Sequence, residues 1–180
     1  MHSSAVLIQP NSTYQKSFLE AVREFQEDGN ALEDTQKLSL ADTEADFEAY
    51  LHSRRKYENP ALLEPGFVAQ SDLWLVENQE FIGRSKLRHA LNDHLRQRGG
   101  HIGYEIRPSK RRMGYGSLIL KLTLERACQL GIERALITCD VENLGSRGVI
   151  EANGGELEGE FVLPGHDKPI RRYWIDFSPV

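Results

Sequence analysis

The sequence predicts a single α/β domain in which a mixed, mostly antiparallel central sheet is flanked by helices. The first observation is the order of patterns along the chain: a strand, two helices, three strands, a helix, a strand, a helix and two terminal strands. The second is the length, because 180 residues suffice for one domain with a substantial core. The third is that the sequence has no repeat, low-complexity tract or interdomain linker, so the predicted domain spans residues 1–180.

The first third, residues 1–60, is predicted to be helical and is acidic. Ser12 can cap a first helix, and Asp42 or Thr43 can begin a second, with a loop at Gly29-Asn30 between them. The first helix would run through Phe18, Leu19, Val22 and Phe25, and the second through Phe47, Tyr50 and Leu51. This third holds eleven acidic and six basic side chains, whereas the remainder holds sixteen of each.

The middle of the chain predicts antiparallel strands. The extended runs Phe67–Ala69, Asp72–Val76 and Phe81–Arg88 form a meander, with a turn at Glu77-Asn78-Gln79 before the last of them. A polar segment, 92–100, then leads to an extended run at 101–106.

That run ends in a basic, glycine-bearing turn just before an amphipathic helix. The first N–H groups of a helix lack intrahelical partners, and the helix dipole adds partial positive charge at that end. Gly114 and Gly116 permit positive φ and close approach of a ligand, while Lys110, Arg111 and Arg112 add formal charge. The turn is therefore predicted to hold a phosphate. The helix is indicated by Leu120, Leu124, Ala127 and Cys128, and it should end at Gly131.

The last part predicts a strand, a short helix and two closing strands. The strand covers 134–139, the helix ends near Asn153-Gly154-Gly155, and the terminal strands lie around 156–162 and 170–177.

The spacing Arg111-x-x-Gly114-x-Gly116 identifies a family. A dinucleotide fingerprint would need glycine at Ile119, and a Walker loop would need Gly-Lys-Ser/Thr. The pattern resembles the Arg/Gln-x-x-Gly-x-Gly/Ala signature of the GNAT superfamily of acyl-CoA-dependent N-acetyltransferases, and the resemblance is clear over about residues 100–177. The wording of 99–108 and 147–155 is closest to bacterial predicted acetyltransferases of undefined substrate.

The resemblance implies a GNAT-like fold and transfer of the acetyl group of acetyl-CoA to a primary amine, by direct attack in a ternary complex. Residues 100–155 would form the acetyl-CoA-binding core, and residues 1–60 would flank the acceptor. There, carboxylates such as Glu33, Asp34, Asp42 and Glu44 could attract a cationic amine, or could simply form a solvated helix face.

The resemblance also implies which residues contact acetyl-CoA. The diphosphate would lie against backbone amides, and an N–H near Ile106 would polarise the thioester carbonyl. Asn143 would contact pantetheine, with Ser146 at the helix start, although both are also good capping residues. The residues implied for the diphosphate turn are Arg111, Arg112, Met113, Gly114, Tyr115, Gly116 and Ser117.

Candidates for proton transfer are less clearly indicated. Glu105 and His101 share one face of a strand but stand about 13 Å apart at roughly 3.3 Å per residue, so they cannot act on one proton. Glu105 is preferred as general base over His101, with a surface ion pair as the alternative. Many family members place a general-acid tyrosine where this chain has Ile150; Tyr173 is a candidate instead, unless it only packs in its strand.

Composition narrows the function further. The sequence lacks a membrane span and a signal peptide, which predicts a cytoplasmic protein. Cys128 and Cys139 are both expected to be buried hydrophobes, and His89 and His94 lack the spacing of a zinc pair, so no metal is expected. The net charge of −5 disfavours nucleic-acid binding. A non-catalytic acyl-CoA-binding or regulatory module stays open as an alternative, and so do a homodimer and acyl groups other than acetyl.

Overall fold

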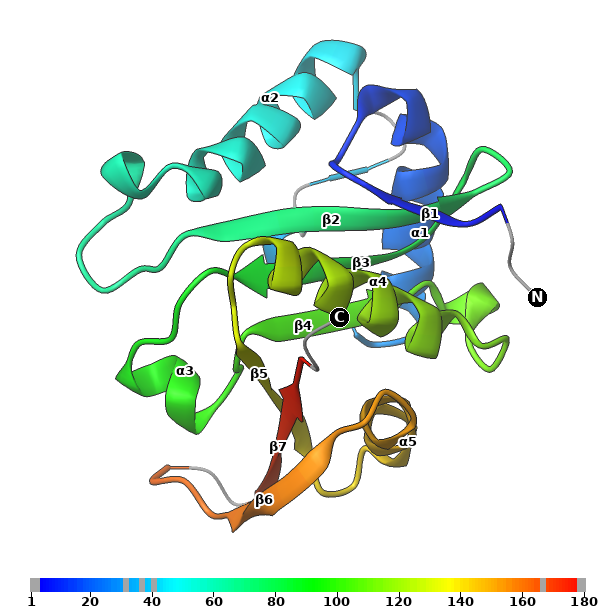
Figure 1. Cartoon of the computed structure of the whole chain (residues 1–180). Helices are drawn as coiled ribbons and strands as arrows, with labels where there is room; N and C mark the ends of the chain where they lie inside the picture. The colour runs from blue at the N-terminus through cyan, green and yellow to red at the C-terminus, as the bar shows by residue number, and fades with distance from the viewer. Residues whose placement is uncertain (1–3, 31–32, 36–37, 40–41, 166–167, 178–180) are drawn as a thin grey trace.

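The computed structural model describes residues 4–30, 33–35, 38–39, 42–165 and 168–177, without the side chain of Glu33 (Figure 1). In chain order its strands and α-helices are β1 (Val6–Ile8), α1 (Gln15–Glu27), α2 (Glu44–Arg55), β2 (Gln70–Glu77), β3 (Glu80–Arg88), α3 (Asp93–Gln97), β4 (Ile102–Ile106), α4 (Tyr115–Gln129), β5 (Arg134–Asp140), α5 (Leu144–Ala152), β6 (Glu156–Phe161) and β7 (Ile170–Asp176). The predicted fold class is confirmed.

The strands divide into two sheets. The first has the order β1-β2-β3-β4 and the second the order β5-β7-β6, and every strand pair in each sheet is antiparallel. The sheets are joined at the start of β4, where the His101 N–H donates to the Leu136 carbonyl at 2.7 Å and the Leu136 N–H donates to His101 Nδ1 at 2.9 Å. Beyond this junction β4 is an edge strand, so its outer backbone groups are available to other partners.

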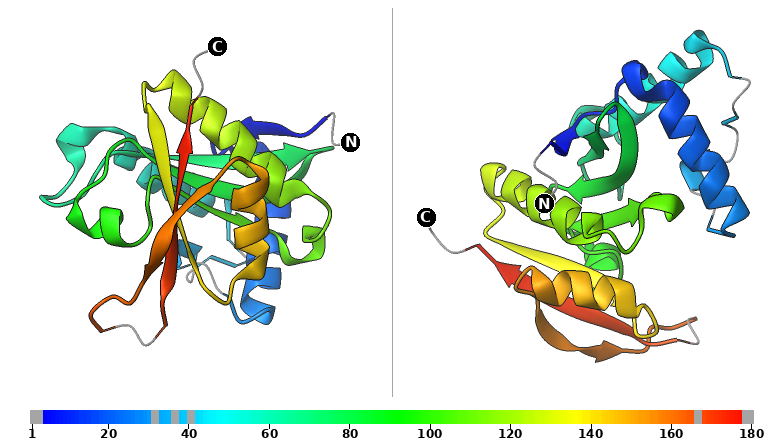
Figure 2. Two further views of the ribbon diagram at one scale, coloured as in Figure 1. Left: turned by 60° about the horizontal axis from the view of Figure 1, so that its bottom comes forward. Right: turned by 90° about the vertical axis from the view of Figure 1, so that its right-hand side faces the viewer.

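Helices cover both faces of the first sheet. Helices α1 and α2 lie on one face, and α4 lies on the other, between the two sheets (Figure 2). On the α1 side, aromatic rings fill the core, with Phe18 stacked on Trp74 at 4.4 Å between ring centroids. On the α4 side, apolar residues of both sheets pack on α4, which fixes the position of its N-terminus. The residues packed there include Leu73, Leu87, Leu120, Leu124 and Ile137.

Local details confirm some predictions and correct others. Thr43 caps α2 in a capping box with Asp46, whereas the first helical segment is capped by Asn11 rather than Ser12, because the Asn11 side chain accepts from the Thr13 N–H. The predicted strand Phe67–Ala69 does not form, since β2 begins at Gln70. The polar segment 92–100 contains α3, a short helix that the sequence pattern did not predict.

The two cysteines differ in burial. Cys139 on β5 is buried, as predicted, but Cys128 on α4 is exposed, so the prediction that it faces the core was wrong. It follows Ala127, which is fully buried, on the helix, and the rotation of about 100° per residue turns it to solvent. Gly131 follows α4 with φ +79°, as expected for the residue that ends a helix.

Candidate functional site

A cavity of about 1180 Å³ lies between the end of β4 and the N-termini of α4 and α5. It extends from these helix ends along the first sheet to α1 and the segment after it. Its size suits a small-molecule site. The lining residues are Phe25, Asn30, Arg84, Lys86, Tyr104, Glu105, Ile106, Arg111, Arg112, Gly114, Gly116, Ser117, Asn143, Leu144, Gly145, Ser146, Gly148 and Val149.

The turn before α4 provides a wall of backbone amides. Gly114 caps the helix with φ +90°, a conformation that glycine adopts without strain. A Cβ at Gly116 would lie 2.9 Å from Cγ2 of Val149, so this glycine lets α4 and α5 approach closely. Within the described part of the chain, the N–H groups of Gly114, Gly116 and Ser117 have no hydrogen-bond partner. Unpaired amides at a helix N-terminus facing a cavity are suited to an anion.

Most basic side chains of the turn hold the turn in place. Arg107 is buried and pairs with Glu24 of α1 at 2.7 Å, while Lys110 pairs with Glu80 at 2.6 Å. Arg111 pairs with Asp28 at 2.8 Å and also donates to the Ile106 carbonyl at 3.3 Å. These contacts attach the turn to α1 and β3.

The other members of the predicted diphosphate turn are arranged differently. Arg112 has φ +62° and lines the cavity. The side chain of Met113 is exposed, and that of Tyr115 is buried with its hydroxyl on Glu77, and neither residue lines the cavity. Any contribution of these two residues to the site is therefore through their backbone.

Polar groups at the start of α5 form the opposite wall. The Asn143 side chain caps α5, since its Oδ1 accepts from the Ser146 N–H at 2.9 Å. The Ser146 hydroxyl lies 3.0 Å from the Tyr104 hydroxyl of β4, and burial raises the pKa of Tyr104 to about 12. Tyr104 could not be predicted as a site residue, because nothing in the pattern of one strand shows that a later helix supplies its partner.

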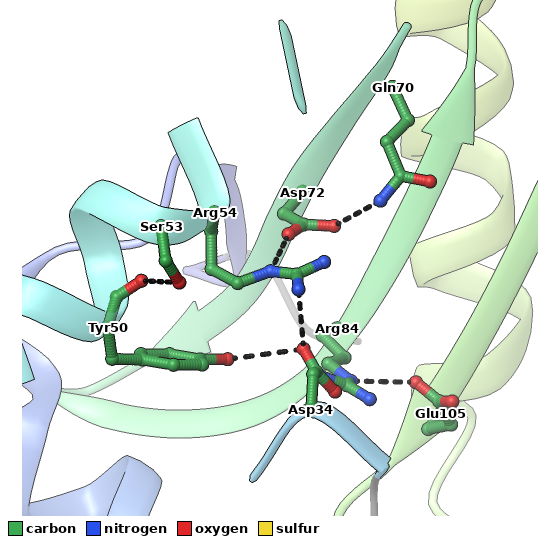
Figure 3. A network of polar contacts seen from close by, with 8 residues as sticks. All are labelled: Asp34, Tyr50, Ser53, Arg54, Gln70, Asp72, Arg84 and Glu105. Atoms are coloured by element: carbon green, nitrogen blue, oxygen red, sulfur yellow. Dashed lines mark hydrogen bonds and ion pairs between the residues drawn. The ribbon is translucent and has the colours of Figure 1, made fainter. Parts of the chain in front are cut away.

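Glu105 lines the cavity from β4, one residue before Ile106 ends the strand. Its Oε2 accepts from Arg84 Nε at 2.9 Å, and its side chain is 42% exposed (Figure 3). Among the described residues its Oε1 has no hydrogen-bond partner. Both predicted roles are therefore compatible with the geometry, because one oxygen is in an ion pair and the other is free.

Arg84 belongs to a network of polar contacts that joins α2, β2, β3 and β4 on the face of the first sheet that α1 and α2 cover (Figure 3). Its Nη1 donates to both oxygens of Asp34 at 2.8 and 2.9 Å. Arg54 pairs with Asp72 at 2.6 Å and with Asp34 at 3.5 Å. Burial alone would raise the pKa of Asp34, but Arg84, Lys86 and Arg54 outweigh it and hold that pKa below its ordinary value. The charge of Asp34 is thus already compensated, by the ion pairs with Arg84 and Arg54 and by the nearby charge of Lys86.

The remaining acidic candidates give no clear acceptor patch. Asp42 accepts hydrogen bonds from Ser39, and Glu44 is exposed in the first turn of α2. The side chain of Glu33 lies outside the described residues.

Two predicted catalytic candidates lie away from the cavity. The Nδ1 of His101 is engaged by Leu136, the residue is 8% exposed, and burial lowers its pKa to about 4. Tyr173 is 1% exposed in β7, with its hydroxyl on Glu151 at 3.2 Å, and burial raises its pKa. Neither lines the cavity. The structure gives His101 the role of joining the sheets and Tyr173 a place in the core.

Two other features are absent from the described residues. None of their helices has the length and apolarity needed to cross a bilayer. They also contain no group of three or more histidine, cysteine, aspartate or glutamate side chains arranged to hold a metal ion.

Comparison with known proteins agrees with this geometry. The family described as Acetyltransferase (GNAT) domain matches residues 18–156. No curated protein matches the chain. Among solved structures, a ribosomal L7/L12 alpha-N-protein acetyltransferase, RimL, in complex with coenzyme A, is similar with a TM-score of 0.67 and 16% identity, over 97% of this chain and 94% of that chain.

Two further structures have similar folds. The microcin C7 self-immunity acetyltransferase MccE, in complex with acetyl-CoA and AMP, has a TM-score of 0.64 and 14% identity over 97% of this chain and 93% of that chain. The putative acetyltransferase YncA from Salmonella typhimurium, with acetyl-CoA, has a TM-score of 0.61 and 11% identity over 97% and 94%. At these identities the similarity establishes the fold.

Proposed function

The chain belongs to the GNAT family of acetyltransferases, and from this premise we propose that it transfers the acetyl group of acetyl-CoA to a primary amine, by direct attack in a ternary complex. The observation that carries the proposal is the row of unpaired amides at Gly114, Gly116 and Ser117, which line the cavity at the start of α4. A diphosphate is the anion expected to bind such a row. The complexes of YncA and MccE with acetyl-CoA support the choice of acetyl-CoA.

The edge of β4 is suited to the thioester end of acetyl-CoA. The Arg107 N–H donates to Ile82 of β3 at 2.9 Å, so by alternation the Ile106 N–H faces the open edge of β4. We assign this group to the thioester carbonyl, where a fixed donor stabilises the oxyanion that develops during attack. Asn143 and Ser146, which line the same cavity, are assigned to pantetheine.

Glu105 is our candidate for the general base. It neighbours Ile106, lines the cavity and keeps Oε1 free to accept a proton from the incoming ammonium, while Arg84 fixes its Oε2. The neutral amine then attacks the carbonyl carbon, a C–N bond forms, the nitrogen loses its second proton to water, and the C–S bond to CoA breaks.

The hydroxyl pair of Tyr104 and Ser146 is our candidate for stabilising the thiolate that leaves, in place of the tyrosine that Ile150 replaces. Because the pKa of Tyr104 is raised to about 12 by burial, it stays protonated and can donate a hydrogen bond. Full proton transfer would come from water, since a thiolate near neutral pH is a fair leaving group.

The alternative is a module that binds acyl-CoA without catalysis. The observation in its favour is Ile150, which is fully buried and offers no acid. One experiment distinguishes the two functions. The protein is mixed with acetyl-CoA and each member of a panel of primary amines, and the release of free thiol is measured. Thiol release together with an acetylated product identified by mass spectrometry supports the enzyme. Saturable acetyl-CoA binding without thiol release from any amine would instead support the module.

A further inference from the structure

We propose that the acceptor amine also carries a carboxylate, which the ammonium group of Lys86 binds inside the cavity. The inference deepens the proposed function and depends on it: it names the substrate class as amino acids, which bear an amine and a carboxylate a few bonds apart. It is drawn from the acceptor half of the cavity, formed by Phe25, Asn30, Arg84, Lys86 and Glu105.

Among the described residues, Lys86 is the cation of this half that has no hydrogen bond or ion pair. It lines the cavity from the middle of β3 and is only partly exposed. Within the described residues its Nζ makes no hydrogen bond and no ion pair. A partly buried ammonium without a partner is unfavourable, and an anionic ligand would remove that cost.

The described acidic neighbours are already paired with arginines, so they act on Lys86 only from beyond ion-pair distance. Asp72 stands directly opposite Lys86 in the strand register, but its Oδ2 is 2.6 Å from Arg54. Asp34 and Glu105 are paired with Arg84.

Two residues further along the same face of β3, Arg88 donates to the carbonyls of Gly99 and Gly100, both at 3.1 Å. A count of the described groups therefore leaves a surplus of positive charge. The cations are Arg54, Arg84, Lys86 and Arg88, and the anions are Asp34, Asp72 and Glu105.

The surface of the sheet beside Lys86 is not covered by a side chain of β4. Its partner in β4 is Gly103, and a Cβ built there would meet only Arg88 Nη1, at 4.0 Å. A side chain at this position would cover the sheet between Lys86 and Glu105. Its absence leaves room for a ligand that touches both.

The separation of Lys86 and Glu105 suits an amino acid. Glu105 pairs with Arg84, two residues before Lys86, so Lys86 and Glu105 are diagonal neighbours on one face, with Cα atoms about 7–8 Å apart. The flexible side chains of Lys86 and Glu105 can contact the carboxylate and the amine of one small molecule. Burial and the adjacent Arg84 also lower the pKa of Lys86, as expected for a cation that needs an anion.

The test compares matched acceptors that differ in one charge. Wild-type protein, Lys86→Met and Lys86→Arg are assayed for thiol release with L-amino acids and with the corresponding carboxamides, and the ratio of kcat/KM for acid and amide is taken. We expect the wild type to favour an acid. Lys86→Met should lower the ratio about tenfold to a hundredfold, the worth of one charge-assisted hydrogen bond, and Lys86→Arg should retain most of it.

Controls separate the possible failures. Lys121→Met, on the exposed side of α4, should give the wild-type ratio, and calorimetric acetyl-CoA affinity verifies that each variant is folded. Carboxamides that react as well as acids, with an equal ratio in wild type and Lys86→Met, would overturn this inference alone. If neither set releases thiol but another primary amine of the panel does, this inference fails and the proposed function stands. If bound acetyl-CoA releases thiol with no primary amine, the proposed function fails as well.

Discussion

The two halves of the cavity are built in different ways. The cofactor half, formed by the turn before α4 and the start of α5, presents mainly backbone groups from short, contiguous segments. The acceptor half presents charged side chains of β3 and β4, and ion pairs with α2, β2 and the segment at Asp34, which are distant in sequence, hold them in place (Figure 3). A site made of backbone groups from one contiguous segment can therefore be predicted from a local sequence pattern. A site made of side chains from distant segments has no such pattern.

Glu105 lies where the halves meet, and its replacement should have the largest effect. Glu105→Gln keeps an acceptor for Arg84 but removes the base, so we expect kcat to fall about 10²- to 10⁴-fold. Acetyl-CoA affinity should stay within about twofold, because this half does not hold the diphosphate. Steady-state kinetics and calorimetry measure the two quantities. Equal rates for both proteins at every pH would remove Glu105 from the mechanism.

Arg84 tests whether the acceptor half is held by its ion pairs. Its side chain is 6% exposed, and Arg84→Met would leave Asp34 and Glu105 without their main partner. We expect the free energy of unfolding in urea to fall by about 3–5 kcal/mol. The matched control is Arg23→Met, which breaks an exposed pair with Glu27 and should cost less than about 1 kcal/mol. Similar losses in the two variants would show that the network contributes no more than a surface pair.

Gly114 tests the cofactor half, with a control at the other end of the same helix. Gly114 and Gly131 both have positive φ, at +90° and +79°, so a valine strains the backbone at either position. Gly114→Val should weaken acetyl-CoA binding about a hundredfold or more, roughly the 3 kcal/mol expected for several charge-assisted hydrogen bonds. Gly131→Val should lose stability but keep its affinity. Calorimetric titration with acetyl-CoA measures the affinity of both variants. Equal affinities for acetyl-CoA would contradict the assignment of the turn as the diphosphate site.

His101 gives the smallest effect and concerns the junction of the sheets rather than the cavity. Its pKa is about 4 in the folded protein, below the ordinary 6.5, so between these values the unfolded chain binds the proton and the folded chain does not. The free energy of unfolding should therefore have its full value above pH 6.5 and decrease by up to about 3 kcal/mol as the pH falls to 4.

The variant His101→Asn keeps an acceptor for the Leu136 N–H but cannot titrate, so it should flatten this dependence. Urea unfolding at several pH values measures it. An unchanged slope in the variant would assign the dependence to other groups.

The sequence predicted what depends on neighbouring residues. The period of α4, its end at Gly131 and the glycine turn before it all follow from local patterns, and the structure has each of them. The resemblance carried by Arg111, Gly114 and Gly116 then predicted the family.

The features that the sequence did not predict depend on long-range contacts or on a marginal local signal. The split into two sheets depends on which strands pair, and the contacts of Tyr104, Arg84 and Lys86 depend on how distant elements meet. Helix α3 is too short and polar to show a period, although Asn92 caps it through the Leu95 N–H. The role of His101 at the junction of the two sheets was not predicted, because its partner Leu136 lies 35 residues away.

The most direct measurement is an amide NMR titration of the ¹⁵N-labelled protein with acetyl-CoA. If the diphosphate lies on the turn, the largest shift changes should occur at the N–H groups of 112–117 and at Ile106, with small changes in β6 and β7. Saturation of the protein with acetyl-CoA while the amides of Gly114, Gly116 and Ser117 keep their positions would contradict the proposed site.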